Sequence, residues 1–302
     1  MFDSFSLLRM MALVYAMMTL SPSWANPPPL SGRFDVGGFA LHMDCWGQGN
    51  PVVVLDAGLA HSSRGWGRII RDLSGTARVC AYDRAGYGLS DPGPLPRTSS
   101  RMAAELRTLL ERAQIPPPFL LVGHSLGGHN MRMFAGLYPH ETAGLILVDA
   151  PHEALVQDFL ESYFMRLIDP HGVLQQLWQP GLLAELNQVD LAPLAPLIGM
   201  KPNVLRTALN EVAAFQESSR ELRALGIRSE VPLVVIMHGY RVFPSTPMGD
   251  QMEQAWLAWQ RDFAARHRYN RFIIAQRSGH DIPGTEPEVI SSAVRLLLDL
   301  YR

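Results

Sequence analysis

Six short, almost wholly apolar segments constrain the fold of this chain more than any other feature of its sequence. They are rich in β-branched side chains, which is typical of strands that are buried on both faces of a sheet. The segments are Pro51–Asp56, Ala77–Tyr82, Phe119–Val122, Gly144–Asp149, Val231–Met237 and Arg271–Gln276. Strands buried on both faces belong to parallel sheets, so the pattern predicts a sheet that is covered by helices on either side.

Helical patterns occupy most of the spaces between these strands. They cover Arg101–Ala113, Gly128–Tyr138, Met248–Arg266 and Glu286–Tyr301, and a Thr285-x-x-Glu288 capping box is expected to begin the last of them. Near the start of the chain, Gly37-Gly38 joins two short runs, Arg33–Val36 and Phe39–Trp46, and predicts a hairpin. Together these patterns predict a doubly wound α/β fold with a mostly parallel, eight-stranded sheet.

One connection is too long for a simple crossover. About eighty residues separate the strand that ends at Asp149 from the next one, whereas a crossover needs only a dozen or two. Residues 151–229 therefore predict a helical cap, inserted after the sixth strand, on the carboxyl edge where open α/β sheets bind ligands. The core is then residues 26–150 and 230–302, and the apolar cap favours a hydrophobic substrate group.

The first 25 residues have the pattern of a signal peptide. Arg9 precedes the apolar run Met10–Leu20, and the small residues Ser23 and Ala25 fit a cleavage site after Ala25. The run is too short to cross a hydrocarbon core of ~30 Å, so we expect export to the periplasm or secretion and no membrane span after processing. An N-terminal anchor or a cytoplasmic location is the alternative.

Charge and motif content exclude several classes of partner. Lys and Arg number 26 against 28 Asp and Glu, without runs of one sign, so no nucleic acid or anionic membrane is expected to bind. The chain has only two cysteines and lacks CxxC, HExxH, GxGxxG and GxxxxGK patterns, so we expect neither a metal nor a cofactor. The expected partner is a small molecule, and the sequence leaves the oligomeric state open.

The segment Gly123-His124-Ser125-Leu126-Gly127-Gly128 carries the strongest chemical signal. It follows an apolar strand and precedes a helical run, which is the strand–turn–helix context of a nucleophile elbow. Gly123 and Gly127 remove side chains that would collide at the bend, and Ser125 then projects above the sheet as a candidate nucleophile. Free amides at the start of the following helix favour negative charge beside it.

A serine nucleophile needs a base, and His280 is the candidate among ten histidines. It follows the last predicted strand, on a loop at the same sheet edge as the elbow. His124 lies within the elbow and is expected to pack or to line the pocket. His61, His129 and His152 are expected at a cleft rim, and the remaining five have no motif around them: His42, His140, His171, His238 and His267.

The chain resembles the α/β-hydrolase superfamily over nearly all of its length after the leader. Besides the elbow, the resemblance rests on Asp56-Ala57-Gly58-Leu59, on Asp83-Arg84-Ala85-Gly86-Tyr87-Gly88-Leu89-Ser90 and on Gly279-His280. It implies an oxyanion hole formed by the backbone amides of Leu59 and Leu126. Many relatives have His-Gly where this chain has Ala57-Gly58.

The acid that would orient His280 departs from the usual family pattern. Most relatives place it after the seventh strand, where this chain has Met237-His238-Gly239 and no carboxylate before Asp250. Some branches place it after the sixth strand, which here ends at Asp149. We therefore expect Asp149 to be the acid and keep Asp250, Glu153 and Asp281 as alternatives.

These residues imply an esterase-like serine hydrolase that forms an acyl-enzyme on a small, hydrophobic ester. The family's dehalogenases and epoxide hydrolases carry an aspartate where Ser125 stands. An aminopeptidase or amidase would use the same triad with a cap carboxylate, for which Glu153, Glu161, Glu185 and Glu211 are candidates. A C–C bond hydrolase and a non-catalytic ligand-binding protein on the same scaffold remain open.

The resemblance also implies a pairing of the two cysteines. In the family's sheet the second strand, here with Cys45, lies antiparallel beside the fourth, here with Cys80. Opposed positions on such strands are close enough for a disulfide, so export predicts a Cys45–Cys80 bridge, and two buried thiols are the alternative.

Overall fold

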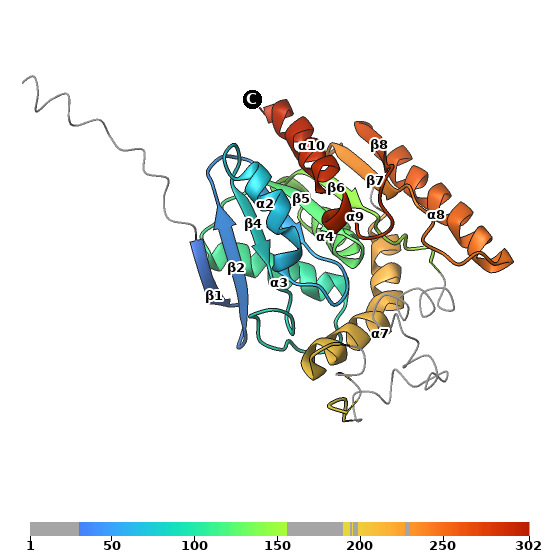
Figure 1. Ribbon diagram of the computed structural model, residues 1–302. Helices are drawn as coiled ribbons and strands as arrows, with labels where there is room; N and C mark the ends of the chain where they lie inside the picture. The colour runs from blue at the N-terminus through green and yellow to red at the C-terminus, as the bar shows by residue number, and fades with distance from the viewer. Residues whose placement is uncertain (1–29, 156–189, 194, 196–198, 227–229, 302) are drawn as a thin grey trace, which may run out of the picture.

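One eight-stranded sheet forms the centre of the computed structural model, which describes residues 30–155, 190–193, 195, 199–226 and 230–301 (Figure 1). The strand order is β1-β2-β4-β3-β5-β6-β7-β8. Pairing is parallel from β4 to β8, whereas β2 is antiparallel to both β1 and β4. The mostly parallel sheet predicted from the sequence is thus confirmed.

The strands follow the predicted apolar segments, with small differences at their ends. All side chains of β3, β4, β5, β6 and β7 are buried, as expected for strands covered on both faces. The bounds are β1 Leu30–Asp35, β2 Ala40–Trp46, β3 Val52–Asp56, β4 Val79–Tyr82, β5 Phe119–His124, β6 Thr142–Val148, β7 Leu233–His238 and β8 Asn270–Ala275.

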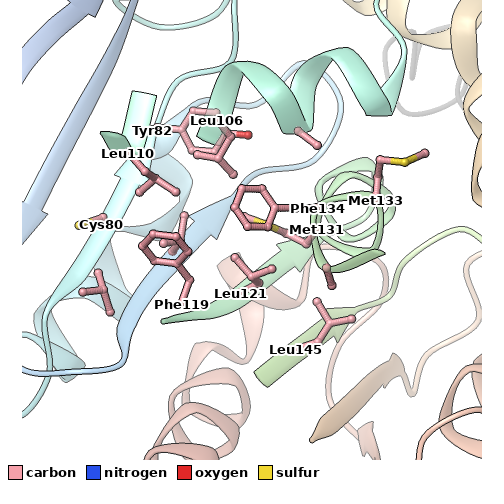
Figure 2. Packing of buried hydrophobic residues seen from close by; sticks show 14 of the residues in the cluster. Cys80, Tyr82, Leu106, Leu110, Phe119, Leu121, Met131, Met133, Phe134 and Leu145 are labelled. Carbon is pink, nitrogen blue, oxygen red and sulfur yellow. The ribbon is translucent and has the colours of Figure 1, made fainter. Parts of the chain in front are cut away.

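Helices cover the two faces of the sheet and give it two apolar cores. On one face, α3 (Ser99–Arg112) and α4 (Leu126–Leu137) pack over a cluster in which Phe119 and Phe134 meet edge to face (Figure 2). On the other face, α2 (Gly67–Leu73) and α10 (Pro287–Leu298) cover the second core. The helix α8 (Pro247–Ala265) packs against β7 and β8 (Figure 1).

The long insertion lies between β6 and β7, where the sequence predicts it. Its described helix is α7 (Pro202–Leu225), which contacts α3 and α4. The predicted cap helices between residues 156 and 189 and the leader up to residue 29 lie outside the described residues. Within the described ranges, no helix is both long and apolar enough to span a bilayer.

Two local predictions differ from the structure. The helix α2 is missing from the sequence prediction, because it is only seven residues long and its pattern is too brief to be periodic. The predicted capping box is wrong: Thr285 ends a short helix, α9 (Ile282–Thr285), and Glu286 precedes α10 without a side-chain cap. The Thr285 hydroxyl instead donates to the carbonyl oxygen of Asp281 at 2.6 Å.

The register of β2 and β4 places Cys45 opposite Cys80, and a disulfide joins them. Their Cα atoms are 4.0 Å apart. Both side chains are buried in the core on the α3 and α4 side of the sheet. The bridge therefore ties the antiparallel edge of the sheet to its parallel centre.

Candidate active site

The sharp turn between β5 and α4 carries Ser125. Its φ and ψ of 52° and −125° place a non-glycine residue in a region that side chains disfavour. A Cβ atom on Gly123 would lie 2.3 Å from the carbonyl oxygen of Gly127, and one on Gly127 would lie 2.3 Å from that of Asp56. The turn therefore requires both glycines, and strain of this kind is concentrated at functional sites.

The Ser125 hydroxyl lies at the carboxyl edge of the sheet, in a buried position. Only 1% of the residue is exposed, and Oγ makes no hydrogen bond to any described residue, His280 included. Leu126 is the first residue of α4, so its amide has no acceptor within the helix. A buried hydroxyl without a partner costs about 1–3 kcal/mol, which is why such groups are rare outside reactive sites.

Asp149, the residue after β6, contacts His280 directly. The distance from His280 Nδ1 to Asp149 Oδ2 is 2.6 Å, and the Asp149 side chain is fully buried. Because a carboxylate only accepts hydrogen bonds, Nδ1 of His280 carries the hydrogen that faces Asp149. Asp149 has a positive φ of 48°, a second strained residue at this edge.

A second histidine, which the sequence prediction left without a role, lies on the same carboxylate. His238 ends β7, and its Nδ1 is 2.9 and 2.8 Å from the two Asp149 oxygens. Trp256 Nε1 donates to Oδ1 at 2.9 Å. Burial alone would raise the pKa of Asp149, but the two histidines outweigh it and hold that pKa far below its usual value.

The structure brings none of the three alternative acids to His280. Asp250 is half exposed and pairs with Arg241 at 2.6 Å. Glu153 is buried against Arg132 at 2.6 Å and also pairs with Arg266. Asp281 caps α9 by accepting from the amide of Gly284 at 3.1 Å.

His124 is hydrogen-bonded to the backbone of the loop that carries His280. Its Nε2 lies 2.8 Å from the carbonyl oxygen of His280, and the two rings are 4.8 Å apart. Burial first, and then the neighbouring His280, lower the pKa of His124 to about 3. His124 is therefore neutral near pH 7 and donates from Nε2 to that carbonyl.

The loop after β3 passes beside Ser125 and is held from behind by Arg84. A Cβ on Gly58 would lie 3.3 Å from Ser125 Cβ, so the two backbones approach closely. Arg84 donates to the carbonyl oxygens of Ala57 and Gly58 at 2.5 and 3.0 Å. Since a trans peptide directs its N–H opposite to its C=O, this contact aims the amide of Leu59 away from Arg84.

Arg84 also connects this loop to the insertion. Its Nε lies 2.9 Å from Glu211 Oε1 on α7, and Tyr87 donates to Glu211 Oε2 at 2.8 Å. Asp56 accepts from the same guanidinium at 2.7 Å. Glu211 is thus fully engaged in a buried network and is not available to bind a ligand.

Of the three histidines expected at a cleft rim, one borders a cavity and two are buried. His61 borders a cavity of about 140 Å³ that Gly58, Trp66 and His124 also line. His129 is instead fully buried between Ser99 and Ser219, where burial lowers its pKa to about 3. His152 pairs with Asp262 at 2.9 Å, behind the elbow helix. Among the described residues, no cluster of three or more metal-ligating side chains occurs.

The elbow, the strand ends and the sheet order agree with a comparison against protein families. A family model for the alpha/beta hydrolase fold matches residues 51–261. The chain belongs to this family. A Bacillus subtilis relative, the uncharacterised protein YqjL, is 32% identical over 262 residues, which are 86% of this chain and 89% of YqjL.

Further relatives match over different extents. An AB hydrolase superfamily protein of Gibberella zeae is 28% identical over 284 residues, covering 83% of this chain and 87% of that protein. An uncharacterised vacuolar membrane protein of Saccharomyces cerevisiae is 31% identical over 150 residues, and the match covers 44% of this chain but only 23% of that protein.

Solved structures with the same fold include hydrolases of different chemistry. A thermophilic esterase from Thermogutta terrifontis has a TM-score of 0.63 at 20% identity, over 89% of this chain and 98% of the esterase. The epoxide hydrolase CorEH has a TM-score of 0.64 at 16% identity, over 91% of this chain and all of that one. At these identities the similarity shows the fold alone.

Proposed function

We propose that the chain is a serine hydrolase that cleaves carboxylic esters through an acyl-enzyme. Ser125 is the nucleophile, His280 the general base and Asp149 the acid that orients it. The observation that carries the proposal is the 2.6 Å contact between Asp149 and His280 at the sheet edge where the elbow presents Ser125. Serine at the elbow favours ester cleavage over the epoxide chemistry of CorEH.

In the proposed first step, Ser125 Oγ attacks the ester carbonyl carbon and His280 Nε2 takes the hydroxyl proton. Asp149 stabilises the imidazolium that forms, because its carboxylate already accepts from Nδ1. The C–O bond of the ester then breaks, and His280 gives its proton to the departing alcohol. Water, deprotonated by His280, attacks the acyl carbon; the bond from that carbon to Ser125 Oγ then breaks, His280 returns the proton to Oγ, and the carboxylic acid is released. The open Ser125–His280 contact is expected to close when substrate binds.

The proposed oxyanion hole consists of the Leu126 and Leu59 amides. The Leu126 amide is free at the start of α4, and Arg84 orients the peptide that carries the Leu59 amide. In known hydrolases, loss of one such donor costs about 3 kcal/mol of transition-state stabilisation. Neither donor needs to reorganise during the reaction.

The described surroundings support a hydrophobic substrate. An apolar cluster of core and α7 residues lies over the carboxyl edge, with Leu59, Leu126 and Trp256 among its members. This cluster favours a hydrophobic acyl or alcohol group. The cavity of about 140 Å³ lined by Gly58, Trp66 and His124 includes neither Ser125 nor His280 in its lining, so it sets no limit on the length of that group.

An aminopeptidase or amidase is less well supported. Such an enzyme needs a cap carboxylate to bind a free amine, yet Glu153 and Glu211 are both engaged by arginines. Glu161 and Glu185 lie outside the described residues. A C–C bond hydrolase and a catalytically silent binding protein have no observation in their favour, and the first would cleave vinylogous diketones.

A substrate screen and an active-site label test the proposal. The purified protein is given p-nitrophenyl esters of increasing acyl length, aminoacyl-arylamides and vinylogous diketones. A fluorophosphonate, which modifies only an activated serine, is used in parallel. We expect hydrolysis of p-nitrophenyl esters and labelling at Ser125 that Ser125→Ala abolishes. Labelling without turnover of any of these substrates leaves an activated serine but contradicts the ester assignment, and absence of labelling contradicts the hydrolase itself.

A further inference from the structure

Both ring nitrogens of His238 face carboxylates. Nδ1 lies 2.8 Å from Asp149 Oδ2, and Nε2 lies 3.1 Å from Glu253 Oε2. Ionised carboxylates only accept hydrogen bonds, so both nitrogens must carry a hydrogen to satisfy the two contacts. His238 is then an imidazolium between two carboxylates, whereas His280 donates to Asp149 through Nδ1.

The Glu253 carboxylate is held in place by the backbone. Its Oε1 accepts from the amides of Val242 and Phe243 at 2.6 and 2.7 Å, and its Oε2 faces His238. Glu253 and Trp256 are three residues apart and therefore lie on the same face of α8. From that face, Glu253 contacts His238 and Trp256 contacts Asp149.

The position of His238 leaves it few other contacts. Its side chain is 2% exposed, and the charged groups that face it are Asp149 at the end of β6 and Glu253 on α8. Burial lowers its pKa, but these two carboxylates outweigh burial and raise the pKa to about 9. This agrees with the charged state that the geometry requires.

We propose that His238 is a positioning residue for the Asp149–His280 pair, and that its positive charge limits how strongly Asp149 attracts a proton to His280. The proposal rests on the proposed function, because it concerns the orienting acid of that reaction. His238 fixes the rotation of the carboxylate by contacting both oxygens and leaves Oδ2 directed at His280. It touches neither Ser125 nor the expected site of the substrate carbonyl.

The charge has a direct consequence for the pH range of activity. His280 must be neutral to act as a base, so activity falls on the acid side when it is protonated. A cation beside Asp149 opposes that protonation and keeps His280 neutral to lower pH. Removal of the cation should therefore shift the loss of activity on the acid side to higher pH and so narrow the pH range of activity.

Two variants separate charge from packing. His238→Gln removes the cation and part of the ring. Glu253→Gln keeps the ring, and its side-chain NH2 can donate to His238 Nε2, which leaves His238 neutral with Nδ1–H still directed at Asp149. The matched control is His267→Gln, a buried histidine bound to the carbonyl oxygen of Val231 at 2.9 Å and outside the site.

The first readout is the pH profile of kcat/KM for an ester. We expect the acid limb of both His238→Gln and Glu253→Gln to move up by about one pH unit, and that of His267→Gln to stay in place. If His238 had a purely structural role, the two variants would lower the plateau value of kcat/KM and leave the pH of the acid limb unchanged. An unmoved limb in Glu253→Gln, with plateau activity retained, overturns the proposal.

The second readout does not depend on turnover. Nitrogen-15 NMR of histidine-labelled protein is recorded on the full chain, on Ser125→Ala and on Glu253→Gln. We expect a doubly protonated His238 that persists through pH 8 and becomes neutral in Glu253→Gln. A neutral His238 at pH 7 overturns the proposal. If no ester is hydrolysed and the fluorophosphonate does not label the protein, the proposed function is contradicted. A His238 that is nevertheless charged would leave the charge assignment in place.

Discussion

Replacement of Asp149 by Asn is the most informative single perturbation of this site. The carboxylate accepts from four donors: the backbone amide of His238 at 3.3 Å, the ring Nδ1 of His238, Trp256 Nε1 and His280 Nδ1. An Asn side chain has one oxygen that accepts and one NH2 group that only donates. At least one donor on this buried group must therefore face the NH2, and His280 is driven to the other tautomer.

The expected magnitudes follow from these contacts. Loss of the correct tautomer in a serine triad costs about three to four orders of magnitude in kcat, as the trypsin-type enzymes show. Stability falls as well, because His238 loses its main counter-charge. The rise in its pKa from 6.5 to about 9 is what remains after the two carboxylates outweigh burial, which lowers that pKa. This net shift corresponds to roughly 3 kcal/mol of stability from the charged form, and we expect the loss of one carboxylate to remove a large part of it.

The assay is ester hydrolysis by Asp149→Asn beside Asp250→Asn, with urea denaturation of both proteins. Asp250 is 57% exposed and pairs only with Arg241 among the described residues, so its replacement should change stability by less than about 1 kcal/mol and leave kcat within a few-fold. A kcat for Asp149→Asn within tenfold of the parent protein would refute the assignment of the acid. A larger loss in Asp250→Asn would transfer that role to Asp250.

Three further predictions concern the nucleophile, the pH dependence of stability and the disulfide. Ser125→Ala should abolish turnover and raise the urea midpoint, because it removes a buried hydroxyl that has no partner to lose; a residual kcat near the parent value would contradict its role. The contribution of charged His238 to the free energy of unfolding is present below pH 6.5 and should disappear as pH rises through about 9. His124 and His129 stay neutral in the fold to about pH 3, so stability should decline as pH falls from 6.5 toward 3, which urea titrations across pH can measure. Reduction of Cys45–Cys80, which closes a loop with a sequence separation of 35, should cost about 3–4 kcal/mol in the chain-entropy model; two alkylatable thiols in protein from an oxidising compartment would contradict the bridge.

The order of strands and helices was accessible from the sequence because buried parallel strands and amphipathic helices have different periods. The ends of elements were less accessible, since hydrogen bonds that are distant in sequence decide them. Thr285 illustrates this point: its hydroxyl bonds to Ser278 at 2.8 Å and to the carbonyl of Asp281, so it completes the His280 loop instead of capping α10. No local motif distinguishes those two uses of a threonine before a glutamate.

The candidate site was accessible to the extent that its residues follow strand ends. Asp149 ends a predicted strand, Ser125 and His280 each follow one shortly, and parallel strands bring those ends to one edge. His238 has the same property and was passed over because no motif surrounds it. Position at the end of β7, next to β6 in the sheet, was the available signal. Arg84 offered no such signal, because its contacts to Ala57, Gly58 and Glu211 depend on how two loops and α7 meet.

The neighbouring positions of Asp149 and His238 explain why the orienting carboxylate can be supplied from the end of either of two strands with the same site geometry. The amide of Asp149 donates to the carbonyl of Ile236 at 2.7 Å, so the residues that follow β6 and end β7 are adjacent across the parallel ladder. A carboxylate at either strand end can reach Nδ1 of a histidine placed after β8. In the proposed assignment the acid stands after β6, and His238, which has its own carboxylate partner, ends β7. The proposed cation at that strand end would then oppose protonation of His280. An enzyme with this arrangement should therefore retain activity at lower pH than a relative that carries its acid after β7 and an uncharged residue after β6, and comparison of the two acid limbs on one ester measures that difference.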